Sequence, residues 1–163
     1  MTAHGTRNTL LPVGTVRGAV LADVPRLAKL MAPFVATGDL LPRGDYDLCR
    51  HIKEYLVVET GEEIVACVSL KIYSQELAEL AALAVRDDWQ GAGLGRTLVE
   101  ALLVEARALG LRTVFALTRK PVFFTRLGFA PAMKEEFPLK VWADCARCPR
   151  QACCDEVAVA LTL

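Results

Sequence analysis

The sequence lacks the features that mark membrane-spanning, secreted or charge-driven nucleic-acid-binding proteins. Its apolar runs are short and broken by charge or glycine, so none reaches the roughly 20 residues that cross a bilayer. Nineteen basic residues balance nineteen acidic ones, which argues against duplex DNA or an anionic membrane surface as a partner. The first residues contain no apolar stretch typical of signal peptides. We therefore expect a cytoplasmic protein that binds neither nucleic acid nor membrane.

The 163 residues also lack internal repeats, low-complexity tracts and any stretch that reads as a domain linker. With 53% hydrophobic residues, the chain is long enough and apolar enough to bury one substantial core. We expect residues 1–14 to form a loose leader and residues 15–163 to form a single domain.

Hydrophobic periodicity predicts the elements of the first half of the chain. Residues 15–20 alternate as a strand does, and residues 21–38 have the spacing of an amphipathic helix with Asp23 as its N-cap. The buried face of that helix is expected to contain Leu27, Leu30, Met31 and Phe34. A short helix over 44–52 and two strands joined by a turn at Gly61 follow.

The second half of the chain predicts crossover connections. Residues 77–85 precede a glycine cluster and read as a strand, and the cluster opens a helix over 93–109 that Gly110 ends. The apolar face of this helix is expected to contain Leu94, Leu98, Leu102 and Leu109. A buried strand, a short helix and a final strand complete the order. This order predicts the α/β class (α+β type), with a mixed central sheet covered by helices on both faces.

The stretch "QGAGLG" at 90–95 predicts a site for a phosphorylated ligand. The first turn of a helix leaves backbone N–H groups unpaired, and glycines let a diphosphate approach them closely. Arg96 could add a charge contact. Because no Lys-Ser/Thr pair follows, a Walker-type nucleotide loop is excluded. The alternative, glycines that serve only a tight turn, is disfavoured by the position of the stretch between a strand and a helix.

This stretch resembles the acetyl-CoA signature of the GCN5-related N-acetyltransferase (GNAT) superfamily, Arg/Gln-x-x-Gly-x-Gly/Ala, with Gln90, Gly93 and Gly95 at its fixed positions. The resemblance implies a single-domain GNAT fold and acetyl-CoA as co-substrate. It also implies that "FFTRLGF" is the helix that packs on the thiol arm of the cofactor, through Phe124. The residues implied to hold acetyl-CoA are Leu83, Ala84, Val85, Gln90, Gly91, Ala92, Gly93, Leu94, Gly95, Arg96 and Phe124.

Further segments, among them "GDLLPRGDYDLCRHIKEYLVVE" and "LKVWADCARC", resemble the acetyltransferase domain of N-acetylglutamate synthases, in particular the short bacterial form without an amino-acid-kinase domain. The resemblance implies direct acetyl transfer to the α-amine of L-glutamate, the first step of arginine biosynthesis. Two alternatives stay open. One is another acceptor, such as a different amino acid, a small amine or a protein N-terminus. The other is a non-catalytic regulator that binds acyl-CoA.

The chemistry of amide formation suggests roles for several residues. The amine is mostly protonated at neutral pH, so a base must act, and Glu79 matches the acidic position of the family motif. The resemblance further implies that backbone N–H groups at 83–85 polarise the thioester carbonyl. Many members carry a tyrosine that protonates the leaving thiolate, but Phe124 occupies that position here. A water, a hydroxyl such as that of Thr118, or no protein acid would take its place.

Glutamate brings two carboxylates, and each favours a cationic partner. Arg43 matches the family motif and offers a bidentate fork, so it is the first choice. Lys140 matches more loosely, and we also count Thr118 among the substrate-contacting residues. Arg119 and Lys120 are second choices, for which a surface position is the simpler interpretation.

Four of the six cysteines lie close together at Cys145, Cys148, Cys153 and Cys154. Reduced thiols in a structural loop are the favoured interpretation. A tetrahedral zinc site and a redox-dependent disulfide are the alternatives, and zinc is not favoured because the adjacent pair strains fourfold ligation. A homodimer formed through the apolar last strand is also compatible with the sequence.

Overall fold

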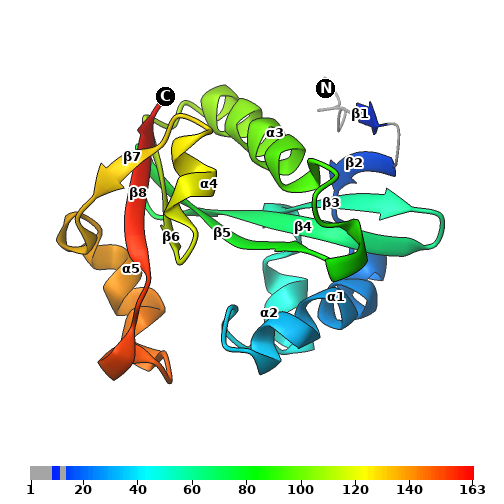
Figure 1. The fold of residues 1–163 in the computed structure, drawn as a ribbon, viewed down its shortest axis with the longest axis horizontal. Helices are drawn as coiled ribbons and strands as arrows, with labels where there is room; N and C mark the ends of the chain where they lie inside the picture. Colours follow the sequence, from blue (N-terminus) through cyan, green and yellow to red (C-terminus); the bar gives the residue numbers. More distant parts are fainter. Residues whose placement is uncertain (1–8, 12–13) are drawn as a thin grey trace. The chain divides into compact units, whose positions relative to one another are not determined.

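The structure is a computed structural model that describes residues 9–11 and 14–163 (Figure 1). They form two compact units. The first comprises the residues up to Ser69 together with Ala82–Leu102, and the second comprises Leu70–Ala81 and Leu103–Leu163. Within the described residues, no helix has the length and apolar character needed to cross a membrane.

The described residues contain eight strands and five α-helices, joined in places by short 3-10 turns. The strands are β1 (Thr9–Leu11), β2 (Gly14–Gly18), β3 (Tyr55–Thr60), β4 (Glu63–Ile72), β5 (Leu77–Val85), β6 (Thr113–Thr118), β7 (Ala130–Ala132) and β8 (Val157–Thr162). The α-helices are α1 (Val24–Ala36), α2 (Asp45–Arg50), α3 (Leu94–Ala108), α4 (Pro121–Thr125) and α5 (Pro138–Ala143). The 3-10 turns are η1 (Leu21–Asp23), η2 (Ile52–Glu54), η3 (Asp87–Trp89), η4 (Lys134–Glu136), η5 (Cys145–Arg147) and η6 (Gln151–Cys153). The strands hydrogen-bond in the order β1-β2-β3-β4-β5-β6-β8-β7.

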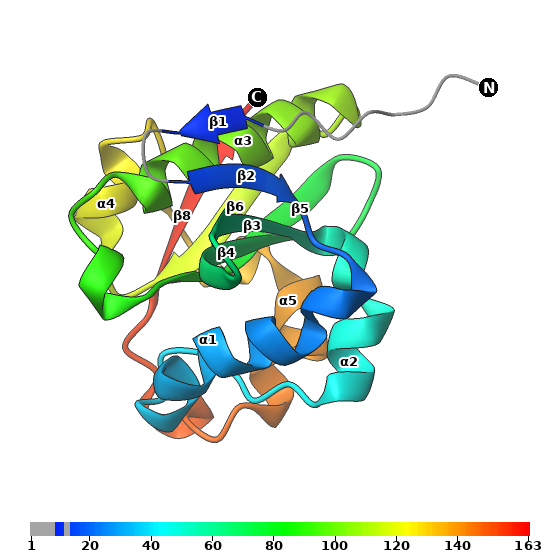
Figure 2. The same cartoon turned by 90° about the vertical axis from the view of Figure 1, so that its right-hand side faces the viewer.

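The first unit is built on the antiparallel strands β1 to β4. Figures 1 and 2 show α1 and α2 on one side of β2, β3 and β4, and the first turns of α3 on the other. Leu27 of α1 and Leu48 of α2 are fully buried against Val57 of β3 and Cys67 of β4. Burying each such side chain stabilises the fold by about 1.5–3 kcal/mol.

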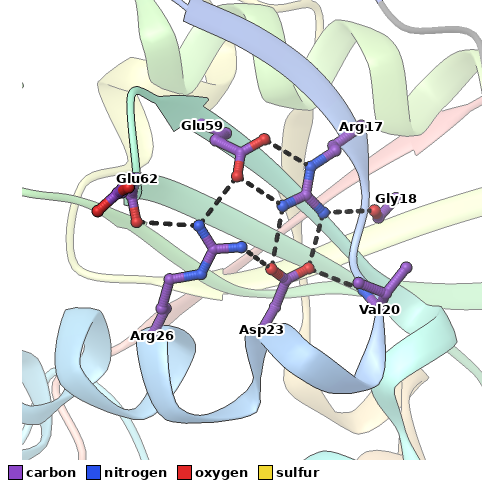
Figure 3. Close-up of polar contacts among 7 residues, drawn as sticks. All are labelled: Arg17, Gly18, Val20, Asp23, Arg26, Glu59 and Glu62. Atoms are coloured by element: carbon purple, nitrogen blue, oxygen red, sulfur yellow. Dashed lines mark hydrogen bonds and ion pairs between the residues drawn. The ribbon is translucent and has the colours of Figure 1, made fainter.

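A buried ion network anchors the start of α1 in this unit (Figure 3). The Asp23 carboxylate is 0% exposed and accepts hydrogen bonds from Arg17 at 2.7 and 3.0 Å, from Arg26, and from the Val20 N–H at 2.8 Å. Glu59 on β3 binds the same two arginines, at 3.0 and 2.9 Å. Asp23 precedes α1 as expected, but its side chain makes no capping hydrogen bond to that helix. Its acceptor sites are used by the arginines instead.

In the second unit β5 pairs parallel with β6 over Leu77–Glu79. The last strand, β8, lies between β6 and β7 and pairs antiparallel with both. Ala158 to Ala160 therefore have strand neighbours on both sides, so these residues cannot pair with a strand of a second copy. Phe115 of β6 stacks on Phe137 with ring centroids 4.1 Å apart.

The expected fold class is confirmed, and the strands and helices predicted from periodicity are present. Three elements were not predicted, namely β7, α5 and β1, of which the last lies inside the expected leader. Gly14, also inside the expected leader, begins β2, and residues 1–8 and 12–13 lie outside the described residues. Leu109 is 61% exposed, not buried, because α3 ends at Ala108 before the apolar face recurs.

We predict that Asp23→Asn lowers the free energy of unfolding at pH 7 by about 3 kcal/mol, because two arginines would lose a buried charged partner. Arg17 holds the pKa of Asp23 at about 2, below its ordinary value of 3.8. The stabilisation by ionised Asp23 is thus fully present above about pH 4 and is lost as the pH falls toward about 2. The difference in unfolding free energy between Asp23→Asn and the wild type therefore shrinks over that window. Urea unfolding followed by circular dichroism at several pH values measures it.

Asp88→Asn is the matched control, because Asp88 also pairs with an arginine but is exposed. Its removal should leave the urea midpoint almost unchanged. Equal effects of the two substitutions would show that burial of the Asp23 network has no energetic consequence.

Candidate functional site

The loop before α3 has a backbone that only glycine adopts readily. Gly91 and Gly93 have φ values of 83° and 82°, in the left-handed region. A β-carbon built on either residue would meet no atom within 4 Å. Backbone conformation, and not crowding by the protein, therefore requires glycine at these two positions, and the space beside them is open.

Helix geometry predicts free backbone donors in the first turn of α3. Thr97 donates its N–H to the Gly93 carbonyl at 3.1 Å, and its hydroxyl donates to the same oxygen at 3.0 Å. Helix geometry leaves the N–H groups of Leu94, Gly95 and Arg96 without acceptors in earlier turns. Together with the helix dipole, these groups can bind an anionic ligand.

Two polar side chains of this loop have partners within the protein. Gln90 donates from Nε2 to the Val85 carbonyl at 3.0 Å and to Asp87 Oδ1 at 3.1 Å. The first of these hydrogen bonds connects the loop to the last residue of β5. Arg96 pairs with Glu100 at 2.8 Å on the exposed surface of α3. Such an exposed pair is weak and can release the guanidinium to a phosphate.

The strand that leads into the loop carries an irregularity at Ala82. Its φ of 52° is the one positive value among the described residues other than glycine. The buried thiol of Cys67 donates to the Ala82 carbonyl at 3.3 Å, and burial raises the pKa of this thiol to about 12. Directly after the strand, Arg86 donates its N–H to the Val65 carbonyl at 2.8 Å. This irregular residue lies directly before Leu83–Val85, for which the sequence predicted carbonyl-polarising amides.

Arg43 lies between α1 and α2 and is half-buried. It lies close enough to Tyr55 for its positive charge to affect the pKa of the phenol. Burial raises the pKa of Tyr55 to about 12, and the positive charge of Arg43 opposes this shift. In residues 9–11 and 14–163 no carboxylate forms an ion pair with Arg43. A half-buried guanidinium without an anionic partner suits an anionic ligand.

In the second unit the candidate base Glu79 is 3% exposed, and both carboxylate oxygens are engaged. Lys140 of α5 approaches Oε1 at 3.0 Å, and the Tyr73 hydroxyl donates to Oε2 at 2.9 Å. A carboxylate this far from water requires such donors. The sequence separately proposed Glu79 and Lys140, and the structure brings them together.

Lys140 is 8% exposed and also contacts Asp144 at 3.0 Å. Burial would lower the pKa of Lys140, but Glu79 and Asp144 outweigh this effect and the pKa is raised. Burial would raise the pKa of Asp144, but Lys71, 2.5 Å away, and Lys140 lower it to about 2. Lys140 is thus a cation held between two carboxylates, so a substrate carboxylate would have to displace one of them.

The remaining candidates of this unit differ in their surroundings. Phe124 is buried and packs edge-on against Phe123 and Phe129 at 5.1 and 5.3 Å. Thr118 ends β6, is partly exposed and accepts the Lys120 N–H at 2.8 Å, so its hydroxyl proton can still be donated. Arg119 pairs with Asp155 at 2.7 Å, which agrees with a surface role.

All six cysteines are free thiols, and among the residues that the structure describes no three metal-ligating side chains are arranged to hold an ion. The structure therefore gives the zinc alternative no support. Cys145 and Cys148 flank a 3-10 turn closed by a 3.2 Å hydrogen bond, and Cys154 lies 3.4 Å from Lys134 Nζ.

Sequence reasoning did not identify Tyr73, Lys71 or Asp144 as neighbours of Glu79. Asp144 follows Lys140 by four residues, a spacing that pairs side chains on a helix and could have suggested the contact. Lys71 lies near the end of β4 and Tyr73 directly follows that strand, and no local sequence pattern marks either residue as a neighbour of Glu79.

A hollow of about 420 Å³ in the first unit lies beside α1 and the turn between β3 and β4. Leu30, Phe34 and Ile64 are among its apolar residues, and Arg86 pairs at its rim with Glu63 at 2.7 Å. Since this rim charge is already neutralised within the protein, we assign the hollow no ligand.

Comparisons with known proteins place this geometry in a family. Residues 25–129 match the model of the acetyltransferase (GNAT) family. An uncharacterized N-acetyltransferase of Chlorobaculum tepidum is 34% identical over 91% of this chain and 96% of its own length. The amino-acid acetyltransferase of Pasteurella multocida is 33% identical over 83% of this chain and 31% of its own length. This chain thus spans about a third of that amino-acid acetyltransferase.

Among solved structures, the N-acetylglutamate synthase of Neisseria gonorrhoeae, complexed with coenzyme A and N-acetylglutamate, superposes with a TM-score of 0.83. It is 28% identical to this chain, and the match covers 95% of this chain and 36% of the other. The resemblance inferred from the glycine stretch is confirmed, and the single mixed-sheet domain is that of an N-acetyltransferase. The chain belongs to the acetyltransferase (GNAT) family.

Proposed function

We propose that this protein transfers the acetyl group of acetyl-CoA directly to the α-amine of L-glutamate. The observation that carries the proposal is the likeness to the N-acetylglutamate synthase of Neisseria gonorrhoeae, which extends over 95% of this chain. The product would belong to arginine biosynthesis, and the enzyme would act in the cytoplasm.

The loop and first helix turn at 90–96 bind the pyrophosphate of acetyl-CoA in this proposal. Gly91 and Gly93 keep the approach to the backbone open, and the N–H groups of the first turn of α3 donate to phosphate oxygens. Arg96 adds charge after leaving Glu100. Phe124 contributes to the packing beneath the thiol arm.

Amide formation then requires an uncharged amine and a polarised thioester. Glu79 accepts a proton from the substrate ammonium, and the amine nitrogen attacks the acetyl carbon. Backbone N–H groups at Leu83–Val85 stabilise the oxyanion, and the C–S bond breaks. Because Phe124 has no proton to give, the thiolate leaves directly or takes a proton from water or Thr118.

Arg43 makes the main contact with a substrate carboxylate in this proposal. It has no carboxylate partner within the described part of the chain, whereas Lys140 is already held by Glu79 and Asp144. Lys140 contributes to substrate binding by exchanging one of these partners.

We predict that Gly93→Ala weakens coenzyme A binding about tenfold, because an alanine at a φ of 82° costs roughly 1–2 kcal/mol. Isothermal titration calorimetry measures the dissociation constant. Gly44→Ala is the control, since Gly44 also has open space around it but has a φ of −76°. Binding by the Gly93 variant that matches the control would argue against the proposed pyrophosphate site.

We predict that Arg43→Ala raises the KM for glutamate by at least about tenfold and leaves coenzyme A affinity unchanged, because a charged hydrogen-bond partner of the acceptor is lost. Steady-state kinetics with thiol detection measure it. Arg50→Ala removes an arginine of α2 that lies 5.7 Å from the exposed ring of Tyr46, and it should behave as wild type. An unchanged KM in the Arg43 variant would remove this residue from the acceptor site.

We predict that glutamate has the highest kcat/KM among the amino acids, small amines and peptide N-termini offered with acetyl-CoA. Release of the coenzyme A thiol measures turnover. If glutamate is among the poorest acceptors, the acceptor assignment is wrong. Coenzyme A binding with no turnover on any amine would favour a regulatory protein instead.

A further inference from the structure

Five side chains of the second unit, Glu79 among them, form a ring of contacts. Lys71 contacts Asp144 at 2.5 Å, and Asp144 contacts Lys140 at 3.0 Å. Lys140 contacts Glu79 Oε1 at 3.0 Å, and Tyr73 donates to Oε2 at 2.9 Å. Lys71 Nζ lies 5.9 Å from the centre of the Tyr73 ring, which closes the circuit. Two cations balance two carboxylates, and Tyr73 is the uncharged member.

The two partners of Glu79 differ in what they can do. The Lys140 ammonium only donates hydrogen bonds, so it favours the ionised carboxylate. The Tyr73 hydroxyl can donate to that carboxylate and can also accept from the protonated acid by rotating. A base that gains and loses a proton in each turnover needs a partner that serves both states, and Tyr73 is the partner that qualifies.

The reaction also requires a path for a proton. When an ammonium group reacts with a thioester, an N–C bond forms, a C–S bond breaks, and the products are an amide, a thiol and one free proton. Glu79 is 3% exposed, so it cannot readily pass this proton to water itself. Tyr73 is partly exposed and touches Glu79 directly.

We propose that Tyr73 is a positioning residue that holds Glu79 in both protonation states and carries its proton to solvent. The hydroxyl accepts the proton from Glu79 while it releases its own to water, so the phenol is unchanged after each cycle. This inference rests on the proposed role of Glu79 in acetyl transfer.

Other ionisable groups lie near Glu79 and Tyr73, but none of them can take the role proposed for the Tyr73 hydroxyl. Lys140 and Asp144 come from α5 and its end, and Lys71 comes from β4. The Cys145 thiol and the Glu156 carboxyl interact with the charges of Glu79 and Lys140. Burial raises the pKa of Cys145 and the pKa of Glu156. Of these groups only Lys140 hydrogen-bonds to Glu79 among the described residues, and its ammonium can donate but cannot accept.

Tyr73→Phe tests the proposal, because it removes the hydroxyl and keeps the ring that packs 5.9 Å from Phe115. We expect kcat to fall about tenfold with the KM for the acceptor unchanged, since a hydrogen bond to a charged group is lost. We also expect the acidic limb of the kcat profile to move up by about one pH unit, because the ionised carboxylate loses a donor. Tyr46→Phe, at an exposed tyrosine, is the control and should match the wild type.

A purely structural role of Tyr73 would lower the melting temperature without moving the pH profile. An unshifted acidic limb with kcat within about twofold of wild type would overturn the proposal. The kinetics use whichever amine the wild type acetylates, so failure of glutamate as acceptor leaves this test intact.

A measurement without substrate separates this inference from the proposed function. In protein labelled with ¹³C at glutamate Cδ and tyrosine Cζ, the Glu79 signal is identified by its loss in Glu79→Gln. The Tyr73 signal is identified by its loss in Tyr73→Phe. In the wild type we expect the Tyr73 signal to shift with pH at the same midpoint as that of Glu79. Independent midpoints would show that the hydroxyl does not respond to the proton on Glu79, and would overturn the inference.

Discussion

The ion pair between Lys140 and Glu79 is the interaction on which the second unit depends. A carboxylate on a buried strand is tolerated only where the fold supplies donors, and α5 supplies the lysine. That lysine requires Asp144, and Asp144 in turn engages Lys71. The position of α5 is therefore tied to β4 and β5 by charge as well as by the stacking of Phe137 on Phe115.

Features that depend on local backbone rules could be predicted from the sequence. The position of Gly91 and Gly93 between a strand and a helix followed from the sequence, and both adopt a left-handed backbone there. The buried face of α1 followed from the spacing of Leu27, Leu30 and Met31, all of which lie in the core. Periodicity and glycine chemistry act within a few residues, so they can be read without knowledge of the fold.

Features that depend on contacts between distant segments could not be predicted. Lys71 and Asp144 are 73 residues apart, and nothing near either one marks the other as its partner. The left-handed backbone of Ala82 also gives no signal, because alanine favours ordinary helix or strand geometry. Likewise, Asp23 has the residue type and position of a helix cap, but Arg17 and Arg26 engage its oxygens. Tertiary partners override local preference at these residues.

The placement of β8 between β6 and β7 has a consequence for the order of assembly. β6 and β7 precede β8 in the chain, and although β6 also pairs with β5, the sheet continues from β6 to β7 only when β8 enters between them. The β6 pairing joins residues that are 39 to 49 positions apart, from Thr118↔Val157 to Thr113↔Thr162. Such non-local pairing slows folding, because the chain entropy of closing a long loop is lost before the strand contacts form. The connection of β7 to the rest of the sheet therefore requires residues 157–162 to be in place first.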